Sequence, residues 1–89
     1  MAKRRSRMDI INSILRSIRE HRVGAYKTQI LYRSNLSHSL LNRYLDFVIE
    51  NELVKTKKTD MRSVYYVTEK GEEFIRTYEE MRSTFSGTV

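Results

Sequence analysis

The stretch SHSLLNR, which begins at Ser37, carries side chains that can recognise the edges of nucleic-acid bases. Arg43 is of a type that binds O6 and N7 of guanine together, and Asn42 can bind N6 and N7 of adenine in the same way. Ser39 and His38 add shorter groups that donate or accept hydrogen bonds. Ser37 itself is suited to cap a helix, and the backbone N–H groups beside it offer a seat for a phosphate. The alternative is a solvated helix face without a ligand.

Three further groups of basic or polar residues fit contacts to a phosphate backbone. Arginine and lysine hold phosphates, and they gain from the negative potential of a narrow minor groove. The groups are Lys27, Thr28 and Arg33, then Lys57, Lys58 and Arg62, and an N-terminal arm with Lys3, Arg4, Arg5 and Arg7. Each group has a simpler explanation: a surface charge at Arg33, a solubilising cluster in the second group, and a solubility tail in the arm.

The charge of the 89-residue chain, +6 in total, is unevenly divided. Residues 1–43 contain ten Lys or Arg against two acidic residues, a balance of +8, whereas residues 44–89 contain seven against nine, a balance of −2. Such an asymmetry indicates a polyanionic partner for one end of the molecule.

The composition argues against several other classes of protein. There is no cysteine, which rules out a disulfide framework and a thiolate metal site. No apolar run approaches the roughly 20 residues of a membrane span. The basic N-terminus leads into an amphipathic pattern rather than into the apolar stretch of a secretory signal.

No group of residues forms a catalytic constellation, so we expect neither an enzyme nor a cofactor. His38 has no carboxylate neighbour in sequence that would orient it as a base. The acidic pairs at 72–73 and 79–80 fit the solvated face of a helix, with Lys70 and Arg76 in reach for ion pairs. There is no glycine-rich phosphate loop and no plausible metal cluster.

The helical periodicity predicts three helices before residue 52. The first carries apolar residues at three- and four-residue steps, and Gly24 is expected to end it before a very short strand. The third is capped by Ser37 and closed by Asn51 in a left-handed conformation. The predicted bounds are Ser6–Arg22, Lys27–Ser34 and Ser37–Asn51.

Only a few residues separate the second and third helices, so the two must cross steeply as a helix-turn-helix unit. Leu36 is expected to fill the corner between them. Four residues of the third helix should face the core, namely Leu41, Tyr44, Leu45 and Val48. Leu40 is half-turned to the outer face, where it would pack on the following hairpin or touch a thymine methyl group.

Strand-forming residues after the third helix predict a hairpin and then a last helix. The strands are expected at Leu53–Thr56 and Ser63–Val67, with the polar segment KKTDMR between them. Thr68 is the predicted N-cap of the last helix. The first half of that helix should pack on the first helix, and the remainder is free to meet a second copy of the chain. The residues that we expect at a dimer contact are Phe74, Tyr78, Met81 and Phe85.

Two stretches and the order of elements resemble the small, basic, archaeal winged helix-turn-helix DNA-binding proteins. The stretches are AYKTQILYRSNLSHSLLNRYLDFVIENELV and VYYVTEKGEEFI, and the resemblance covers about residues 8–82. It implies an α+β, mainly α fold with a three-helix core, a β-hairpin wing and a C-terminal helix. We expect this domain at 8–84, after a basic arm at 1–7 and before a flexible C-terminus at 85–89.

The sequence departs from the pattern of this family at two positions. Glu52 stands where the family usually has glycine before the first wing strand, so Asn51 is expected to take the left-handed conformation there. Tyr26 stands where serine or threonine opens the second helix, which indicates a different cap.

The resemblance implies binding to double-stranded DNA, usually as a homodimer joined by the last helix. The third helix would then read the major groove, while a wing at 57–62 follows the backbone or the minor groove. A transcriptional regulator is the leading hypothesis, cytoplasmic and associated with the nucleoid. The alternatives are an architectural chromatin-type protein with little sequence preference, and a winged helix that binds another protein.

Overall fold

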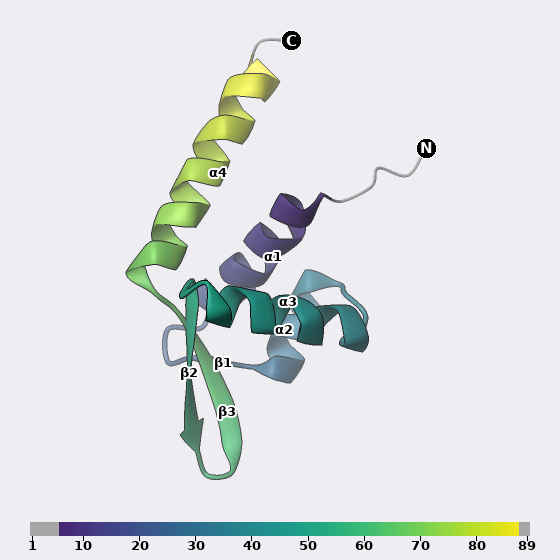
Figure 1. Cartoon of the computed structure of the whole chain (residues 1–89), viewed down its shortest axis with the longest axis vertical. Helices are drawn as coiled ribbons and strands as arrows, with labels where there is room; N and C mark the ends of the chain where they lie inside the picture. Colours follow the sequence, from purple (N-terminus) through teal and green to yellow (C-terminus); the bar gives the residue numbers. More distant parts are fainter. Residues whose placement is uncertain (1–5, 88–89) are drawn as a thin grey trace.

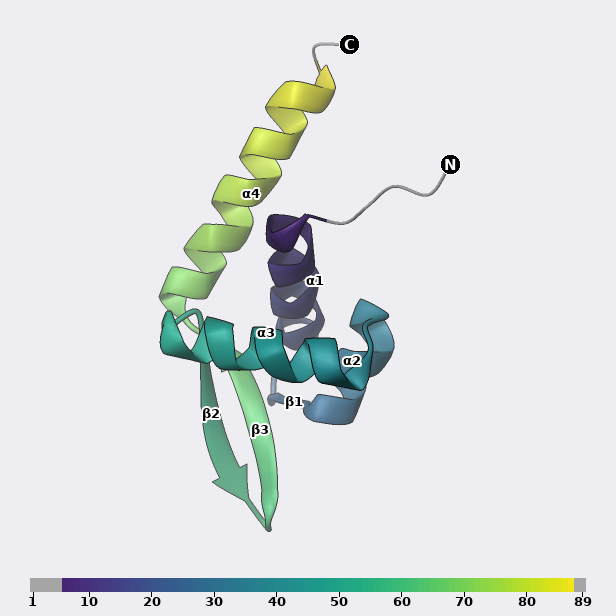
Figure 2. The same cartoon turned by 45° about the vertical axis from the view of Figure 1, so that its right-hand side comes forward.

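The computed structural model describes residues 6–87, and their side chains as far as Thr84. The helices α1, α2 and α3 gather around one core, while a hairpin projects from one end and α4 extends from the other (Figures 1 and 2). The elements are α1 (Arg7–Arg19), β1 (Ala25–Tyr26), α2 (Lys27–Ser34), α3 (His38–Glu50), β2 (Val54–Thr59), β3 (Arg62–Val67) and α4 (Glu69–Gly87). The predicted α+β, mainly helical fold is therefore confirmed.

Helix α1 is the centre of the core and begins with a reciprocal cap. The Ser6 hydroxyl accepts from the Asp9 N–H at 3.1 Å, and an Asp9 carboxylate oxygen accepts from the Ser6 N–H at 3.0 Å. Helix α1 contacts α2, α3, α4 and the strands β1 and β3. Its fully buried apolar residues are Ile14, Leu15 and Ile18. No helix in the described part of the chain is long and apolar enough to cross a bilayer.

The end of α1 corrects the predicted boundary. The helix stops at Arg19 rather than at Arg22, because the chain must turn early to deliver β1 to the sheet. Gly24 makes this turn with a φ of 102°, and a Cβ there would lie 2.1 Å from Cγ1 of Val64. Glycine is therefore required at this position, both for its left-handed backbone and for the close approach to β3.

The turn between α2 and α3 has the predicted form, with one residue that the sequence did not indicate. Asn35 closes α2 in the left-handed conformation, at a φ of 57°. Ser37 then caps α3, accepting from the Leu40 N–H at 3.2 Å, as predicted. Leu36 is half-buried against the core between the two helices. The start of α2 is capped from inside the helix, since the Gln29 side chain accepts from the Tyr26 N–H at 2.8 Å.

The end of α3 differs from the prediction in its left-handed residue. Asn51 has a φ of −90°, and Glu52 is left-handed at 62°. The Leu53 N–H donates to the Val48 carbonyl at 2.9 Å, which closes the helix in a Schellman motif. In this motif the left-handed residue stands one position beyond the cap, so Glu52 occupies it despite the unfavourable φ. The prediction for Asn51 was therefore wrong.

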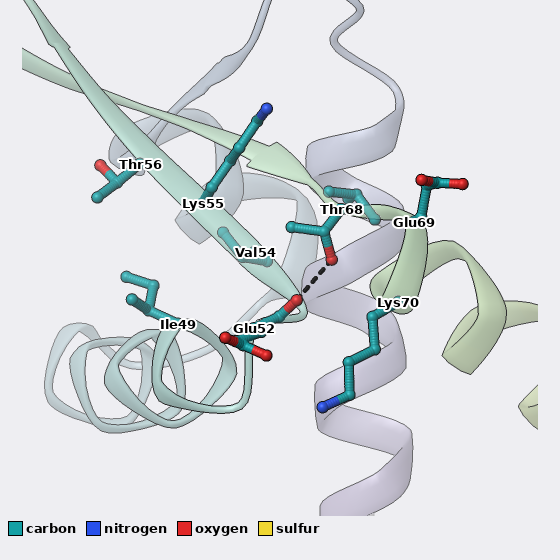
Figure 3. A pocket seen from close by; sticks show the side chains of 9 residues that line it. Ile49, Glu52, Val54, Lys55, Thr56, Thr68, Glu69 and Lys70 are labelled. Atoms are coloured by element: carbon teal, nitrogen blue, oxygen red, sulfur yellow. Dashed lines mark hydrogen bonds between the residues drawn. The ribbon is translucent and has the colours of Figure 1, made fainter.

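A network around Thr68 joins the end of α3 to the start of α4. The Thr68 hydroxyl donates to the Glu52 carbonyl at 2.6 Å, drawn as the dashed line in Figure 3, and accepts from the Gly71 N–H at 3.0 Å. The Thr68 N–H donates to the Leu53 carbonyl at 3.0 Å. Thr68 is thus the predicted N-cap of α4, and it also fixes this helix to the preceding turn.

The sheet has the order β1-β3-β2 with antiparallel neighbours, and its hairpin is longer than predicted. The pairing continues to Thr59 and Arg62, so only Asp60 and Met61 form the turn. Both turn residues are left-handed, with φ values of 46° and 66°, as in the tight turns that match the twist of a hairpin. The segment KKTDMR is therefore mostly strand, which corrects the expected polar loop.

Helix α4 runs antiparallel to α1 and is joined to it by ion pairs. Arg16 pairs with Glu79 at 3.3 Å, and Arg19 with Glu72 at 3.2 Å. The sequence places these acidic residues in reach of Lys70 and Arg76 on their own helix, but their ion pairs are with arginines of α1. The pairs are half-exposed, so each stabilises the fold by at most about 1 kcal/mol. Their main effect is to fix how α4 lies along α1.

The first half of α4 packs on α1, as predicted. Ile75 is buried in the core, and Phe74 is stacked against Tyr78 with ring centroids 6.5 Å apart. The Tyr78 hydroxyl donates to the Asp9 carboxylate. This hydrogen bond lowers the pKa of Asp9 below its usual value and raises the pKa of Tyr78.

Candidate nucleic-acid interface

Helix α3 has a buried face toward the core and an exposed face opposite to it. Leu41, Leu45 and Val48 are buried, as predicted, whereas His38, Ser39 and Arg43 are exposed. Helical spacing places Ser39 and Arg43 one turn apart on the same side. Arg43 forms no ion pair with any residue in the described range, so its guanidinium is available to a partner.

The two residues between these faces are only partly accessible. Asn42 is half-buried at the edge of the exposed face. Leu40 is half-buried and packs against the core cluster. The N-terminal half of the outer face is therefore polar, and Leu40 contributes little apolar surface to it.

The outer face of α3 has an acidic end, which was not predicted. Asp46 and Glu50 are exposed and follow Arg43 at helical steps. Their negative charges would repel a polyanion from the C-terminal half of α3, which favours contact through the first two turns of the helix. The sequence could have indicated this acidic end, because carboxylates three and seven residues after Arg43 lie on the same side of a helix.

The residues expected around α2 have different environments. Lys27 is half-buried and Thr28 exposed at the first turn of the helix. Arg33 pairs with Glu20, which follows α1. Arg33 therefore has a structural role as the partner of Glu20, and its guanidinium is less available to a ligand. Tyr32, which was not among the predicted contacts, is 90% exposed on the same helix.

The hairpin divides its cations between two faces. Side chains alternate along a strand, so Lys58 lies on the face that Val54 turns toward the core and α3. Lys57 and Arg62 lie on the opposite face. There the Arg62 guanidinium stands 4.5 Å from the centre of the Tyr26 ring, a cation–π contact that orients it. Tyr26 was considered only as a cap, and its role under Arg62 depends on strand pairing.

The N-terminal arm is described only at its last two residues, Ser6 and Arg7. Lys3, Arg4 and Arg5 lie outside the described residues. Arg7 is the exposed first residue of α1, at the end of that helix away from the hairpin (Figure 2). Arg7 and the hairpin cations are thus at opposite ends of α1.

The expected dimer residues are divided between the core and the surface. Phe74 and Tyr78 are half-buried within the chain itself. Met81 is 54% exposed, almost one turn after Tyr78 on α4. Met8, in the first turn of α1, is 47% exposed. The side chain of Phe85 lies outside the described ones.

An open groove of about 820 Å³ lies between the end of α3, β2 and the start of α4 (Figure 3). Its apolar lining consists of Ile49, Val54 and Val67. Its charged residues are of both signs, namely Glu52, Lys55, Glu69 and Lys70. Among the described residues, no cluster of three or more His, Cys, Asp or Glu could hold a metal ion.

Comparisons with known proteins agree with this architecture. Residues 4–86 match the model of the winged helix-turn-helix family. The uncharacterized protein MJ0290 of Methanocaldococcus jannaschii is 32% identical over 78 residues, which are 88% of this chain and 34% of that protein. This chain therefore spans about a third of that relative's length.

A solved structure shares the fold. The crystal structure of Sso10a-2, a DNA-binding protein from Sulfolobus solfataricus, superposes with a TM-score of 0.82 over 94% of this chain and 85% of that chain. The two sequences are 24% identical. These matches confirm the resemblance seen in the sequence, and the chain belongs to the winged helix-turn-helix family.

Proposed function

We propose that this protein binds duplex DNA, with the first two turns of α3 in the major groove and the hairpin on the backbone or minor groove. The observation that carries this proposal is the exposed and unpaired Arg43 on the outer face of α3, in the same fold as the exposed hairpin cations Lys57, Lys58 and Arg62. A guanidinium in this position can bind guanine bidentately. The similarity to Sso10a-2, which is titled a DNA-binding protein, supports the same function.

Within this function, we propose that Ser39, His38 and Asn42 contact base edges beside Arg43. The N–H groups near Ser37 and the residues Lys27 and Thr28 would hold phosphates. Arg33 would add a phosphate contact only if it leaves Glu20. The arm residues Lys3, Arg4, Arg5 and Arg7 would follow the backbone of the flanking DNA.

The role that we propose is transcriptional regulation, and a binding titration tests it. Fluorescence anisotropy would compare a random duplex with the duplex upstream of the gene for this protein, at two salt concentrations. A regulator should prefer its own site by at least about 10³-fold. Equal, salt-dependent affinities would indicate an architectural protein. No binding at low salt would refute the DNA hypothesis and favour a protein-binding winged helix.

Replacing Lys58 by alanine should weaken binding to all duplexes alike. Lys58 lies on the face of the hairpin toward α3, where it can reach a phosphate of the groove that α3 enters. Loss of one phosphate contact lowers the slope of log affinity against log salt by about 0.9. Lys70→Ala is the matched control, since it removes the same charge beside the groove of Figure 3. A change in base preference, or an equal effect of both variants, would contradict this assignment.

We further propose a two-fold homodimer joined by the C-terminal half of α4. Met8, next to Asp9, and Met81, three residues after Tyr78, present exposed apolar surface. Helix α4 continues beyond α1 to Gly87 (Figure 1). In such a dimer the two α3 helices would read half-sites about 34 Å apart.

Replacing Met81 by lysine should raise the dimer dissociation constant about tenfold or more, because a charge would replace an apolar side chain at the interface. Sedimentation equilibrium over a range of concentrations measures this change. Ser83→Lys adds the same charge on the opposite side of α4 and should leave the dimer intact. A wild-type protein that stays monomeric at high concentration would rule out the dimer.

A further inference from the structure

The turn of the hairpin carries an apolar side chain, Met61, that is not packed in the core. Met61 is 97% exposed and is the second residue of the two-residue turn. Single exposed apolar residues are common, but Met61 is also left-handed, with a φ of 66°. This conformation is unfavourable for any residue with a side chain, and a glycine after Asp60 would be the favoured choice. Met61 therefore lowers the stability of the hairpin without packing on the protein.

The hairpin holds this side chain away from the rest of the molecule. Its strands are paired continuously from Val54–Val67 to Thr59–Arg62, which makes a stiff two-stranded ribbon. Figures 1 and 2 show the ribbon projecting beyond the helices, with the turn as its outermost point. A ligand that approaches the end of the hairpin would therefore contact Met61 first.

The charges next to Met61 indicate a polyanion as that surface. Lys57, Lys58 and Arg62 are exposed close to the turn, against the single acid Asp60. Lys58 is on one face of the hairpin and Arg62 on the other. Cations on both faces can contact the two phosphate strands that border a groove, and the apolar tip then points at the bases between them.

We infer that Met61 is a wedge that enters between base pairs from the minor groove and bends the duplex. This inference rests on the DNA-binding function proposed above. Apolar side chains in the minor groove, methionine among them, partly unstack a base step and kink the duplex by roughly 20–90°. Pyrimidine–purine steps such as TA unstack most easily. Met61 would therefore add a preference for such a step below the hairpin, separate from the bases read by α3.

Two substitutions test the wedge without weakening the hairpin. Met61→Gly removes the side chain and gives the Asp-Gly sequence that favours this turn, so the hairpin should become more stable. Met61→Leu keeps an apolar side chain of similar size at the same backbone cost. Each protein would be titrated with the tightest-binding duplex, labelled with a donor and an acceptor dye at its two ends. Energy transfer then reports bending, and anisotropy reports affinity.

For wild type and Met61→Leu, we expect energy transfer to increase on binding. Met61→Gly should bind without this increase and on the order of tenfold more weakly. Equal bending by wild type and Met61→Gly, or binding by wild type without any bending, would overturn the wedge and leave the DNA-binding function intact. A wild-type protein that binds no duplex at low salt would overturn both proposals.

Discussion

Replacing Arg43 by alanine is expected to weaken binding to the preferred DNA site by about 1–3 kcal/mol, roughly 5- to 150-fold. Arg43 is exposed on α3, makes no ion pair with any residue that the structure describes, and precedes the acidic end of the same face. Its guanidinium is thus the strongest candidate on this helix for bidentate contact with a guanine. Anisotropy titrations against the preferred duplex and single-base variants would measure the loss.

The substituted protein should also lose its preference at one base pair, because the bidentate contact is the source of that preference. Arg43→Lys separates this effect from charge: it keeps the cation but loses the planar fork, so affinity should fall less than selectivity. Arg76→Ala is a matched control, since it removes an exposed arginine from α4, away from the proposed interface. An Arg43→Ala protein with unchanged affinity and base preference would show that α3 does not enter the groove as proposed.

The core and the helix-turn-helix unit could be predicted from sequence because their signals are local. The predicted bounds of α2 and the cap at Ser37 are confirmed. Both depend on apolar periodicity and on a hydroxyl next to it, which neighbouring residues determine. The same periodicity predicts which face of α3 is buried and which is exposed, so the exposure of Arg43 could also be predicted.

The failures occurred where distant segments decide the local structure. Glu52 is left-handed because it stands one position beyond the cap of the Schellman motif. Its carbonyl accepts a hydrogen bond from the hydroxyl of Thr68, which is 16 residues later in the sequence. The hairpin extends to Arg62 because its strands pair with each other, although the residues are polar. Likewise, the arginine partners of Glu72 and Glu79 come from α1. None of these contacts leaves a pattern within a window of a few residues.

Gly71→Ala is expected to destabilise the fold by about 1–3 kcal/mol, the usual cost of forcing an extra carbon into a packed site. A Cβ at Gly71 would lie 2.2 Å from the Leu53 carbonyl oxygen and 2.7 Å from Cγ1 of Val67. The first contact is with backbone, which no change of side-chain rotamer can relieve. Relief requires α4 to move away from the end of α3, and this movement breaks the hydrogen bonds of Thr68 to Glu52 and Leu53.

The sign of this effect makes the experiment decisive. In an exposed helix, replacing glycine by alanine stabilises by about 1 kcal/mol, so helix propensity alone predicts the opposite result. Urea unfolding followed by circular dichroism would compare wild type, Gly71→Ala and Ser83→Ala, an exposed position on the same helix that should change by a few tenths of a kcal/mol. A Gly71→Ala protein as stable as wild type would mean that α4 is not fixed to the turn at Leu53. If Gly71→Ala is destabilised as expected, the close approach of the α4 backbone to the Leu53 backbone explains why glycine stands in the TEKG stretch. The same contact then holds α4 at a fixed angle to the hairpin.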